Sequence, residues 1–261
     1  MGDRLTATLW LLWDCSRMQA RELAGHPLAL IIGVVQPAVF LMITMGFDSA
    51  ELGADRATQL AVAVILTSLW ASTVWMAGGI LHREQELGTL AANVASVHPG
   101  FLVLLGKCLG ATVRTVLGIL VAAGVTVVLI GAPVQLKQPE LLLLGLVTVV
   151  ASGTALGMLM SCLFLVTPYG MHLSSALMYP IFLLGGMLIP ADVLPGPLQF
   201  VSKLISLHWA QEFLTGAALG HTDVNAYLIM VGLTVGYFVA AVWTFNRLVD
   251  HARRGGTLEL V

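Results

Sequence analysis

Long charge-free stretches alternate with short polar ones along the chain. A membrane-spanning helix needs about 20 apolar residues, because the hydrocarbon layer is about 30 Å thick and a helix rises about 1.5 Å per residue. Four windows of this kind are bounded by charged residues. Another stretch, 141–189, is long enough for two crossings if the chain turns at Pro168 and Gly170. The pattern predicts six spans, at about 27–47, 57–81, 108–132, 141–166, 172–189 and 224–245.

The first 25 residues do not span. In residues 1–25, leucines recur at helical spacing beside Trp10 and Trp13, with charged residues between them. Such a pattern predicts an amphipathic helix that lies in the membrane interface, where the tryptophan ring suits a half-apolar setting. This helix serves either as a simple anchor or as an element that also transmits motion.

A second non-spanning segment, 83–98, follows the second predicted span. Its apolar residues repeat at helical spacing from Leu87 onwards, and polar residues occupy the other faces. We expect a short cytoplasmic helix with Glu84 and Glu86 in its first turn, where the helix dipole favours acidic groups, and with Pro99 at its end. The pattern fits either a solvated loop helix or a docking surface.

The third non-spanning segment, 190–222, begins with several prolines and continues with two apolar pieces. Each piece is too short to cross the hydrocarbon layer. We expect an outer hairpin of re-entrant or surface-lying helices between the fifth and sixth spans.

Composition supports a lipid environment. The chain is 58% hydrophobic and 10% charged, with a mean hydropathy of +0.92, whereas soluble domains are about 25% charged. A net charge of -2 excludes the basic face that a nucleic-acid partner would need. The three cysteines lie far apart in the sequence, so we expect neither a metal site nor a disulfide framework.

The positive charges give the orientation, because short loops rich in Lys and Arg stay in the cytoplasm. With both termini inside, nine of the 12 Lys and Arg fall on the inner side and three on the outer side. The inner ones are Arg4, Arg17, Arg21, Arg83, Lys107, Arg114, Arg247, Arg253 and Arg254, and the outer ones are Arg56, Lys137 and Lys203. Arg114 falls within the third predicted span, and we expect its side chain to extend towards the headgroups.

Two local patterns predict packing features. Four pairs of glycines four residues apart, which let helices approach closely, occur at Gly106/Gly110, Gly153/Gly157, Gly216/Gly220 and Gly232/Gly236. Gln36 and Pro37 stand inside the first span, where a proline frees a carbonyl group and can kink a helix.

Motifs and residues that the sequence lacks argue against ATP binding and proton-coupled transport by this chain. It contains no GxxxxGK[ST] motif for ATP, since Gly106 and Lys107 are followed by Cys108 and preceded by no matching glycine. No acidic residue lies in mid-span, which argues against a proton-coupled transporter. We therefore expect no catalytic residues, cofactor or metal in this chain itself.

The arrangement resembles the type-2 ABC exporter permeases over nearly the whole chain. The matching motifs are Arg21-Glu22 before Pro27, the run from Arg83 to Thr89 with Pro99 and Gly106-Lys107 downstream, and Gly185-Gly186-x-x-Ile189-Pro190 before Leu194-Pro195. The chain departs from the family at Leu207-His208-Trp209, where a proline is common.

The resemblance implies a fold class and a set of partners. The fold is an all-α membrane protein with the six spans and outer hairpin given above, in a bacterial cytoplasmic (inner) membrane. Segment 83–98 becomes the coupling helix that rests on a separate ATPase. Two ATPase subunits, which bind ATP and Mg, would work with two permease copies, identical or homologous, surrounded by lipid.

The resemblance also nominates residues. The ATPase-coupling candidates are Arg83, Glu84, Gln85, Glu86, Thr89 and Asn93. Candidates for a substrate path, from spans two and five, are Trp70, Trp75, Met76, Met178, Tyr179 and Phe182. Their apolar character suits a hydrophobic or amphiphilic cargo such as a drug, lipid or glycan.

Two other functions remain open. The chain could be a non-transporting assembly or anchor subunit, because coupling is a property of the whole complex. A six-span intramembrane hydrolase would need a serine in a GxSx setting and a histidine in another span, whereas the near-span His172 falls at an expected loop.

Overall fold

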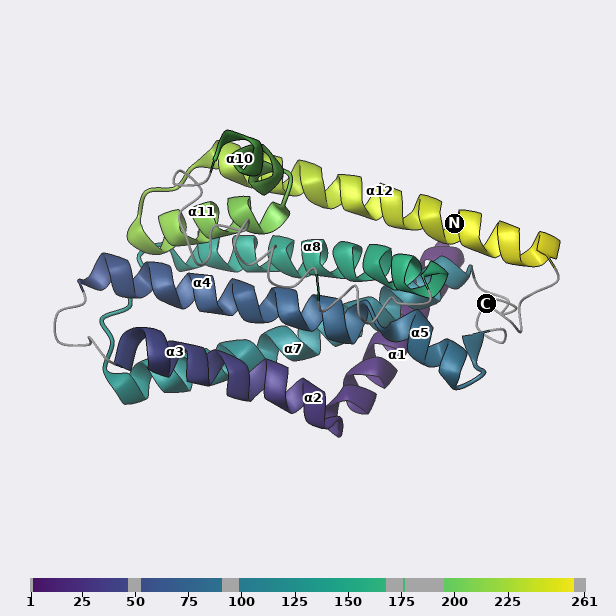
Figure 1. Cartoon of the computed structure of the whole chain (residues 1–261), viewed down its shortest axis with the longest axis horizontal. Coiled ribbons are helices and arrows are strands. Elements are labelled where there is room, and N and C mark those ends of the chain that lie inside the picture. The colour runs from purple at the N-terminus through teal and green to yellow at the C-terminus, as the bar shows by residue number, and fades with distance from the viewer. Residues whose placement is uncertain (1, 47–52, 91–98, 168–175, 177–194, 256–261) are drawn as a thin grey trace.

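The computed structural model describes residues 2–46, 53–90, 99–167, 176 and 195–255. Within these residues the regular structure is helical, and the long helices lie side by side in an elongated bundle (Figure 1). The elements in chain order are α1 Gly2–Ala24, α2 Pro27–Leu30, η1 Ile31–Val35, α3 Gln36–Gly46, α4 Ala54–Ser72, η2 Thr73–Ala77, α5 Ile80–Glu86, α7 Gly100–Ile130, α8 Pro139–Val166, α10 Gly196–Lys203, α11 Ser206–Leu219 and α12 Val224–Gly255; η marks a π-helical turn.

Five predicted spans coincide with helices that are long and apolar enough to cross a membrane. These segments are Pro27–Gly46, Ala54–Glu86, Gly100–Ile130, Pro139–Val166 and Val224–His251. Of the predicted span 172–189 the structure describes residue 176 alone, and residues 190–194 at the start of the outer hairpin lie outside the described residues.

Helix α7 begins at Gly100, about two turns before residue 108, where the third span is predicted to start. Two charged residues made the apolar window look short. Lys107 nevertheless lies inside the helix, buried and ion-paired. Pro99, whose φ is fixed by its ring, marks the true start.

The bundle has two distinct ends. α1 begins, α5 ends and α12 ends at one end, and α10 and α11 lie at the opposite end (Figure 1). The second end is tied together by polar contacts, among them those from the Gln135 backbone N–H to Thr58 Oγ1 at 2.9 Å and from the Lys137 N–H to the Ala218 carbonyl at 3.0 Å. We call these the α5 end and the α11 end.

The predicted N-terminal helix is confirmed as α1, and it packs on α7 at two glycines. A Cβ atom on Gly106 would lie 2.8 Å from the Cys15 Cβ, and one on Gly110 would collide with the Ser16 carbonyl. The opposite side of α1 exposes Leu9, Trp10 and Trp13, in keeping with a helix at a lipid interface.

The irregularity expected near Pro37 is present as the π-helical turn η1, which ends one residue before Gln36. The Gln36 N–H donates to the carbonyl of Ile31 five residues earlier. Because Pro37 has no N–H, the chain widens by one residue here and re-forms a regular helix beyond it.

Two short helices, α10 and α11, occupy the described part of the predicted outer hairpin. α11 has 14 residues, too few to cross a bilayer, and buries Ala210, Phe213 and Leu214 between α4, α8 and α12. The Tyr237 hydroxyl on α12 donates to the Leu204 carbonyl at 2.7 Å and accepts from the Ser206 N–H at 3.2 Å. The hairpin is therefore anchored to the bundle.

The α1–α7 contact gives a matched pair of variants. Gly110→Ala should destabilise the protein by about 1–3 kcal/mol, because the added methyl group forces the α1 backbone away. Gly232→Ala on α12 should be neutral or slightly stabilising, because no atom of the described residues lies within 4 Å of the position and alanine favours a helix. Thermal unfolding midpoints in one detergent measure both; equal midpoints would contradict the packing described.

Candidate coupling site

A break in the helix of the second span marks the α5 end. η2 closes with the Gly78 N–H donating to the Thr73 carbonyl at 2.8 Å, and α5 starts only at Ile80. Helix α8 comes very close at this point. A Cβ atom on Gly78 would lie 2.9 Å from Phe164 Cε2, and one on Gly157 would lie 2.5 Å from the Ala77 Cβ. We call the stretch 73–79 the joint.

The joint is held by the side chain of Arg83. Its guanidinium reaches back along the helix and donates to the Met76 carbonyl at 2.7 Å and to the Trp75 carbonyl at 3.4 Å. A charged donor to a carbonyl is worth more than a neutral one, about 1.5–3 kcal/mol in favourable cases. Arg83 thus links the tip of α5 to the π-helical turn that precedes it.

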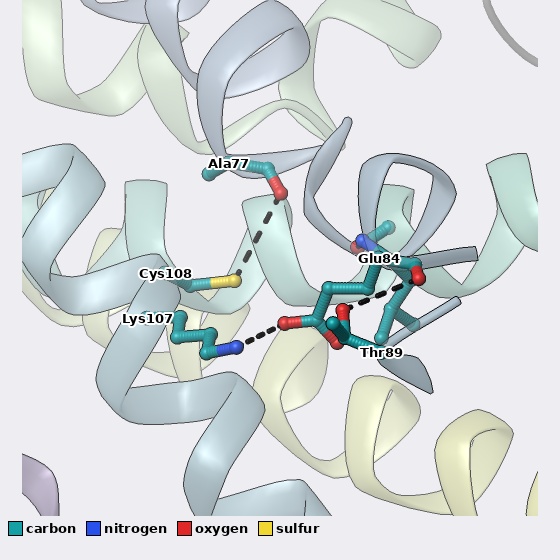
Figure 2. Close-up of polar contacts among 7 residues, drawn as sticks. Ala77, Glu84, Thr89, Lys107 and Cys108 are labelled. Carbon is teal, nitrogen blue, oxygen red and sulfur yellow. Dashed lines mark hydrogen bonds and ion pairs between the residues drawn. The ribbon is translucent and has the colours of Figure 1, made fainter. Parts of the chain in front are cut away.

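Two more side chains reach the same backbone from neighbouring helices. The Cys108 thiol on α7 contacts the Ala77 carbonyl at 4.0 Å, and the Ser161 hydroxyl on α8 accepts from the Leu81 N–H at 3.0 Å (the Cys108 contact is drawn in Figure 2). Polar backbone groups at an irregular turn inside a membrane need such partners.

Helix α5 ends in a Schellman motif. Gly88 has a φ of 69°, the left-handed conformation that glycine adopts without a steric penalty. The Gly88 N–H donates to the Gln85 carbonyl at 3.0 Å and the Thr89 N–H to the Glu84 carbonyl at 2.9 Å, and the Thr89 hydroxyl adds a bond to the same Glu84 oxygen. The helix direction therefore changes sharply at Gly88.

A buried ion pair joins α5 to α7. The ammonium group of Lys107 contacts the carboxylate of Glu84, and both residues are less than a tenth exposed (Figure 2). Each charge alone would be expensive to bury, since unpaired ions at such sites cost several kcal/mol. The pair therefore fixes the end of α5 against the second turn of α7.

Helix α1 completes the site. A cleft of about 290 Å³ opens between α1 and α5, with Met18 and Glu22 on one wall and Arg83 and Leu87 on the other. Close by, Cys15 is half-buried against Gly106, and burial raises the pKa of its thiol, while the nearby Lys107 acts in the opposite direction.

The tip of α5 is exposed on the side away from these contacts. Leu87 is 72% exposed. The Glu86 carboxylate lies 3.5 Å from His82 Nε2 one turn earlier and remains largely solvent-exposed. An acidic group and a leucine at the end of a firmly held helix form a surface that another protein can contact.

The structure brings most of the predicted coupling residues together at the tip of α5, and their role in coupling stays a prediction. Arg83, Glu84, Gln85, Glu86 and Thr89 all lie at the tip of α5, and Asn93 lies outside the described residues, as does 91–98 generally. The placement of Glu84 and Glu86 in the first turn of a helix over 83–98 was wrong, because α5 already begins at Ile80 and ends at the Gly88 cap. Both glutamates occupy its last turns.

The sequence did not single out the partners that hold this site. In the sequence Lys107 counts among the inner positive charges and stands in a family motif, Cys108 is one of three scattered cysteines, and Ser161 belongs to no pattern discussed above. A lysine in an otherwise apolar helix could have indicated a buried carboxylate partner, because an unpaired charge is rarely buried. Its sequence separation from Glu84 hides which carboxylate that is.

The predicted path residues lie within the bundle where they are described. Trp70 is 3% exposed and Met76 is 1% exposed, while Trp75 is half-buried. Met178, Tyr179 and Phe182 lie outside the described residues. A role in a substrate path stays a prediction for all six. In the described ranges no group of three or more His, Cys, Asp or Glu could hold a metal ion.

Comparison with known protein families shows to which family of proteins the chain belongs. The family model described as ABC-2 type transporter matches residues 11–219. The chain belongs to this family, the membrane component of ABC transporters, and with its apolar helices it is a multi-pass membrane protein. A comparison with curated proteins found no match.

The buried pair leads to a test by double substitution. Lys107→Met should lower the free energy of unfolding by about 3 kcal/mol or more, because it leaves the Glu84 carboxylate buried without a partner. Adding Glu84→Gln to that variant should recover most of the loss. Chemical denaturation in mild detergent measures both.

An exposed pair supplies the control for this test. Glu86→Gln should change stability by less than about 1 kcal/mol, since exposed pairs contribute little. A Lys107→Met loss no larger than the Glu86→Gln loss would show that the Glu84–Lys107 pair does not hold α5.

Proposed function

We propose that the chain is the permease subunit of an ATP-driven exporter and that the tip of α5 docks on a separate ATPase, which binds ATP and Mg. Family membership supports a permease, because ABC-2 proteins pair with an ABC ATPase. The cargo is hydrophobic or amphiphilic, in keeping with the apolar walls that α4 supplies. The α5 end faces the cytoplasm of a bacterial inner membrane, on the side with most Lys and Arg.

The proposal rests on a difference in burial between neighbouring residues within one helical turn of α5. Glu84 is buried and paired with Lys107, whereas Glu86 and Leu87 project from the bundle. Arg83 and Glu84 bond the tip of α5 to the neighbouring helices. A partner that moves the exposed tip would therefore also move those helices.

The same contacts define two routes for transmitted motion. The Glu84–Lys107 pair links the tip of α5 to α7. The Arg83 side chain links the tip to the joint, residues 73–79, which follows α4 in the chain. Close helix contacts such as that of Gly157 with Ala77 make the joint sensitive to small displacements, since packed interfaces switch rather than deform continuously. Closure of the ATPase would in this way change how α4, α7 and α8 pack.

A six-span subunit is supported by the ends of the described helices. α8 ends at the α5 end, where the Ser161 hydroxyl bonds Leu81, while α10 begins at the α11 end (Figure 1). The described helices before and after residues 168–194 thus end and begin at opposite ends of the bundle, which supports the proposal of a fifth span. α1 and α12 both reach the α5 end, which supports the proposal that both termini lie in the cytoplasm (Figure 1).

Two permease copies fit the packing of one bundle. The cavity between α4, α8, α11 and α12, lined by Trp70, Ser152 and Ser206, has about 10 Å³ of space, about enough for one water molecule. A cargo of drug or lipid size needs far more room. The translocation path is therefore proposed to form between two copies, identical or homologous.

Charge reversal at the exposed tip tests the docking. The double variant Glu86→Arg with Leu87→Ser should reduce co-purification of the ATPase and ATP-dependent transport at least about tenfold, because both side chains are lost from the contact. Thermal stability should stay within about 1 kcal/mol of the parent. Transport in inside-out vesicles and pull-down of the tagged ATPase give the two readouts.

Glu212→Arg is the matched control, because Glu212 is exposed on α11 at the opposite end of the bundle. It should leave both readouts unchanged. Normal association with the ATPase in the tip variant would contradict the docking site. Normal association but no ATP-driven transport of any amphiphilic cargo by the parent protein would instead favour the anchor-subunit alternative.

A further inference from the structure

The helix of the second span is interrupted at two adjacent glycines. In the part of the chain that the structure describes, the Gly79 N–H makes no backbone hydrogen bond and the Gly78 carbonyl accepts none. In an unbroken helix the Gly79 N–H would donate to the Trp75 carbonyl, four residues earlier. The Arg83 guanidinium donates to that carbonyl instead. A side chain thus takes the place of a backbone donor at the break.

A second replacement involves helix α8. In an unbroken helix the Leu81 N–H would donate to the Ala77 carbonyl. In the structure it donates to the Ser161 hydroxyl at 3.0 Å, and all three residues are at most 3% exposed. The Ala77 carbonyl is contacted by the Cys108 thiol at 4.0 Å, and a carbonyl oxygen has two lone pairs. The Leu81 N–H therefore has one acceptor on α8 and another in its own helix.

The joint lies against a closely packed face of α8. A Cβ atom on Gly78 would lie 2.9 Å from Phe164 Cε2. One on Gly157 would lie 2.5 Å from the Ala77 Cβ. Gly157, Ser161 and Phe164 share one face of α8, because they follow one another at helical spacing. Of these three only Ser161 has a polar side chain, so its hydroxyl supplies the hydrogen bond between this face and the second span.

A hinge in a buried part of a membrane protein needs a partner for each backbone group in every position, because water is not there to replace a lost hydrogen bond. If the joint moved away from α8, the Leu81 N–H would lose the Ser161 hydroxyl. Transfer of this N–H to the Ala77 carbonyl keeps the number of hydrogen bonds constant. The two arrangements then differ little in free energy, and the two glycines allow the change in backbone angles.

We infer that Ser161 is a positioning residue for coupling. It holds the Leu81 N–H while the joint lies against α8, and the N–H passes to the Ala77 carbonyl when the tip of α5 and the joint move together away from α8. Arg83 keeps the tip and the joint together during this movement. The inference rests on the proposed coupling through α5, and it makes α8 the helix from which the joint is released.

Ser161→Ala in the complete transporter tests the inference. Without the hydroxyl, the Leu81 N–H bonds to the Ala77 carbonyl and the released arrangement is favoured throughout the ATP cycle. Association with the ATPase should be unchanged, because Glu86 and Leu87 remain, while transport per ATP hydrolysed should fall at least about tenfold. The thermal unfolding midpoint should stay within about 3 °C of the parent, because the N–H keeps a partner.

Two further variants complete the test. Ser161→Cys keeps a weak acceptor, so its transport ratio should lie between those of the parent and Ser161→Ala. Ser152→Ala is the matched control, because it removes another buried hydroxyl from α8, one that bonds the Ser206 hydroxyl on α11 at 2.8 Å rather than the second span. It should leave the transport ratio unchanged.

A parent-like transport ratio in Ser161→Ala, or an equal fall in Ser152→Ala, would overturn the role of Ser161. A midpoint more than about 3 °C lower in Ser161→Ala, or its failure to fold, would show that the Leu81 N–H has no second acceptor and would overturn the exchange. If the parent chain itself binds no ATPase, the proposed function fails, whereas the midpoint of Ser161→Ala still decides whether the exchange occurs.

Discussion

The buried pair between Glu84 and Lys107 is the interaction on which the α5 end of the molecule depends. Neither charge is tolerable alone in a membrane-facing bundle, so each requires the other. Their pairing fixes the distance between the end of the second span and the start of α7. Because α1 crosses α7 beside Lys107 at Gly106 and Gly110, the position of the N-terminal helix follows from the same contact.

Arg83 adds a second constraint, which runs back along the second span. It bonds back to the carbonyls of Trp75 and Met76, so the tip of α5 and the irregular turn η2 form one unit. The glycines on either side, Gly78 and Gly157, allow α8 to lie against that unit. The site therefore combines an exposed tip with an interior attachment, which is the arrangement that a coupling element needs.

Sequence reasoning predicted the spans well because the bilayer imposes a simple rule on apolar length. The ends of the helices were harder to predict, since the rule treats every charge as a boundary. Lys107 and Glu84 lie inside helices because each neutralises the other, and that pairing joins residues 23 positions apart on different helices. No local pattern reveals it.

The sequence likewise does not show which helix packs against a given pair of glycines. The Gly106/Gly110 spacing indicated a close helix contact, yet only the fold shows that α1 is the partner. The similar Gly232/Gly236 spacing meets no atom of the described residues within 4 Å. Arg83 was identified as a coupling residue by its place in a motif. Its bonds to Trp75 and Met76 require the break after η2, which the sequence pattern did not predict.

The central claim is that the tip of α5 and the joint move as one unit because Arg83 connects them. The most direct test replaces Arg83 by Gln in the complete transporter and measures ATP-dependent cargo transport alongside ATPase association. The account predicts that the ATPase still binds, since Glu86 and Leu87 are untouched, while transport per ATP hydrolysed falls at least about tenfold. Transport that remains at the parent ratio would contradict it.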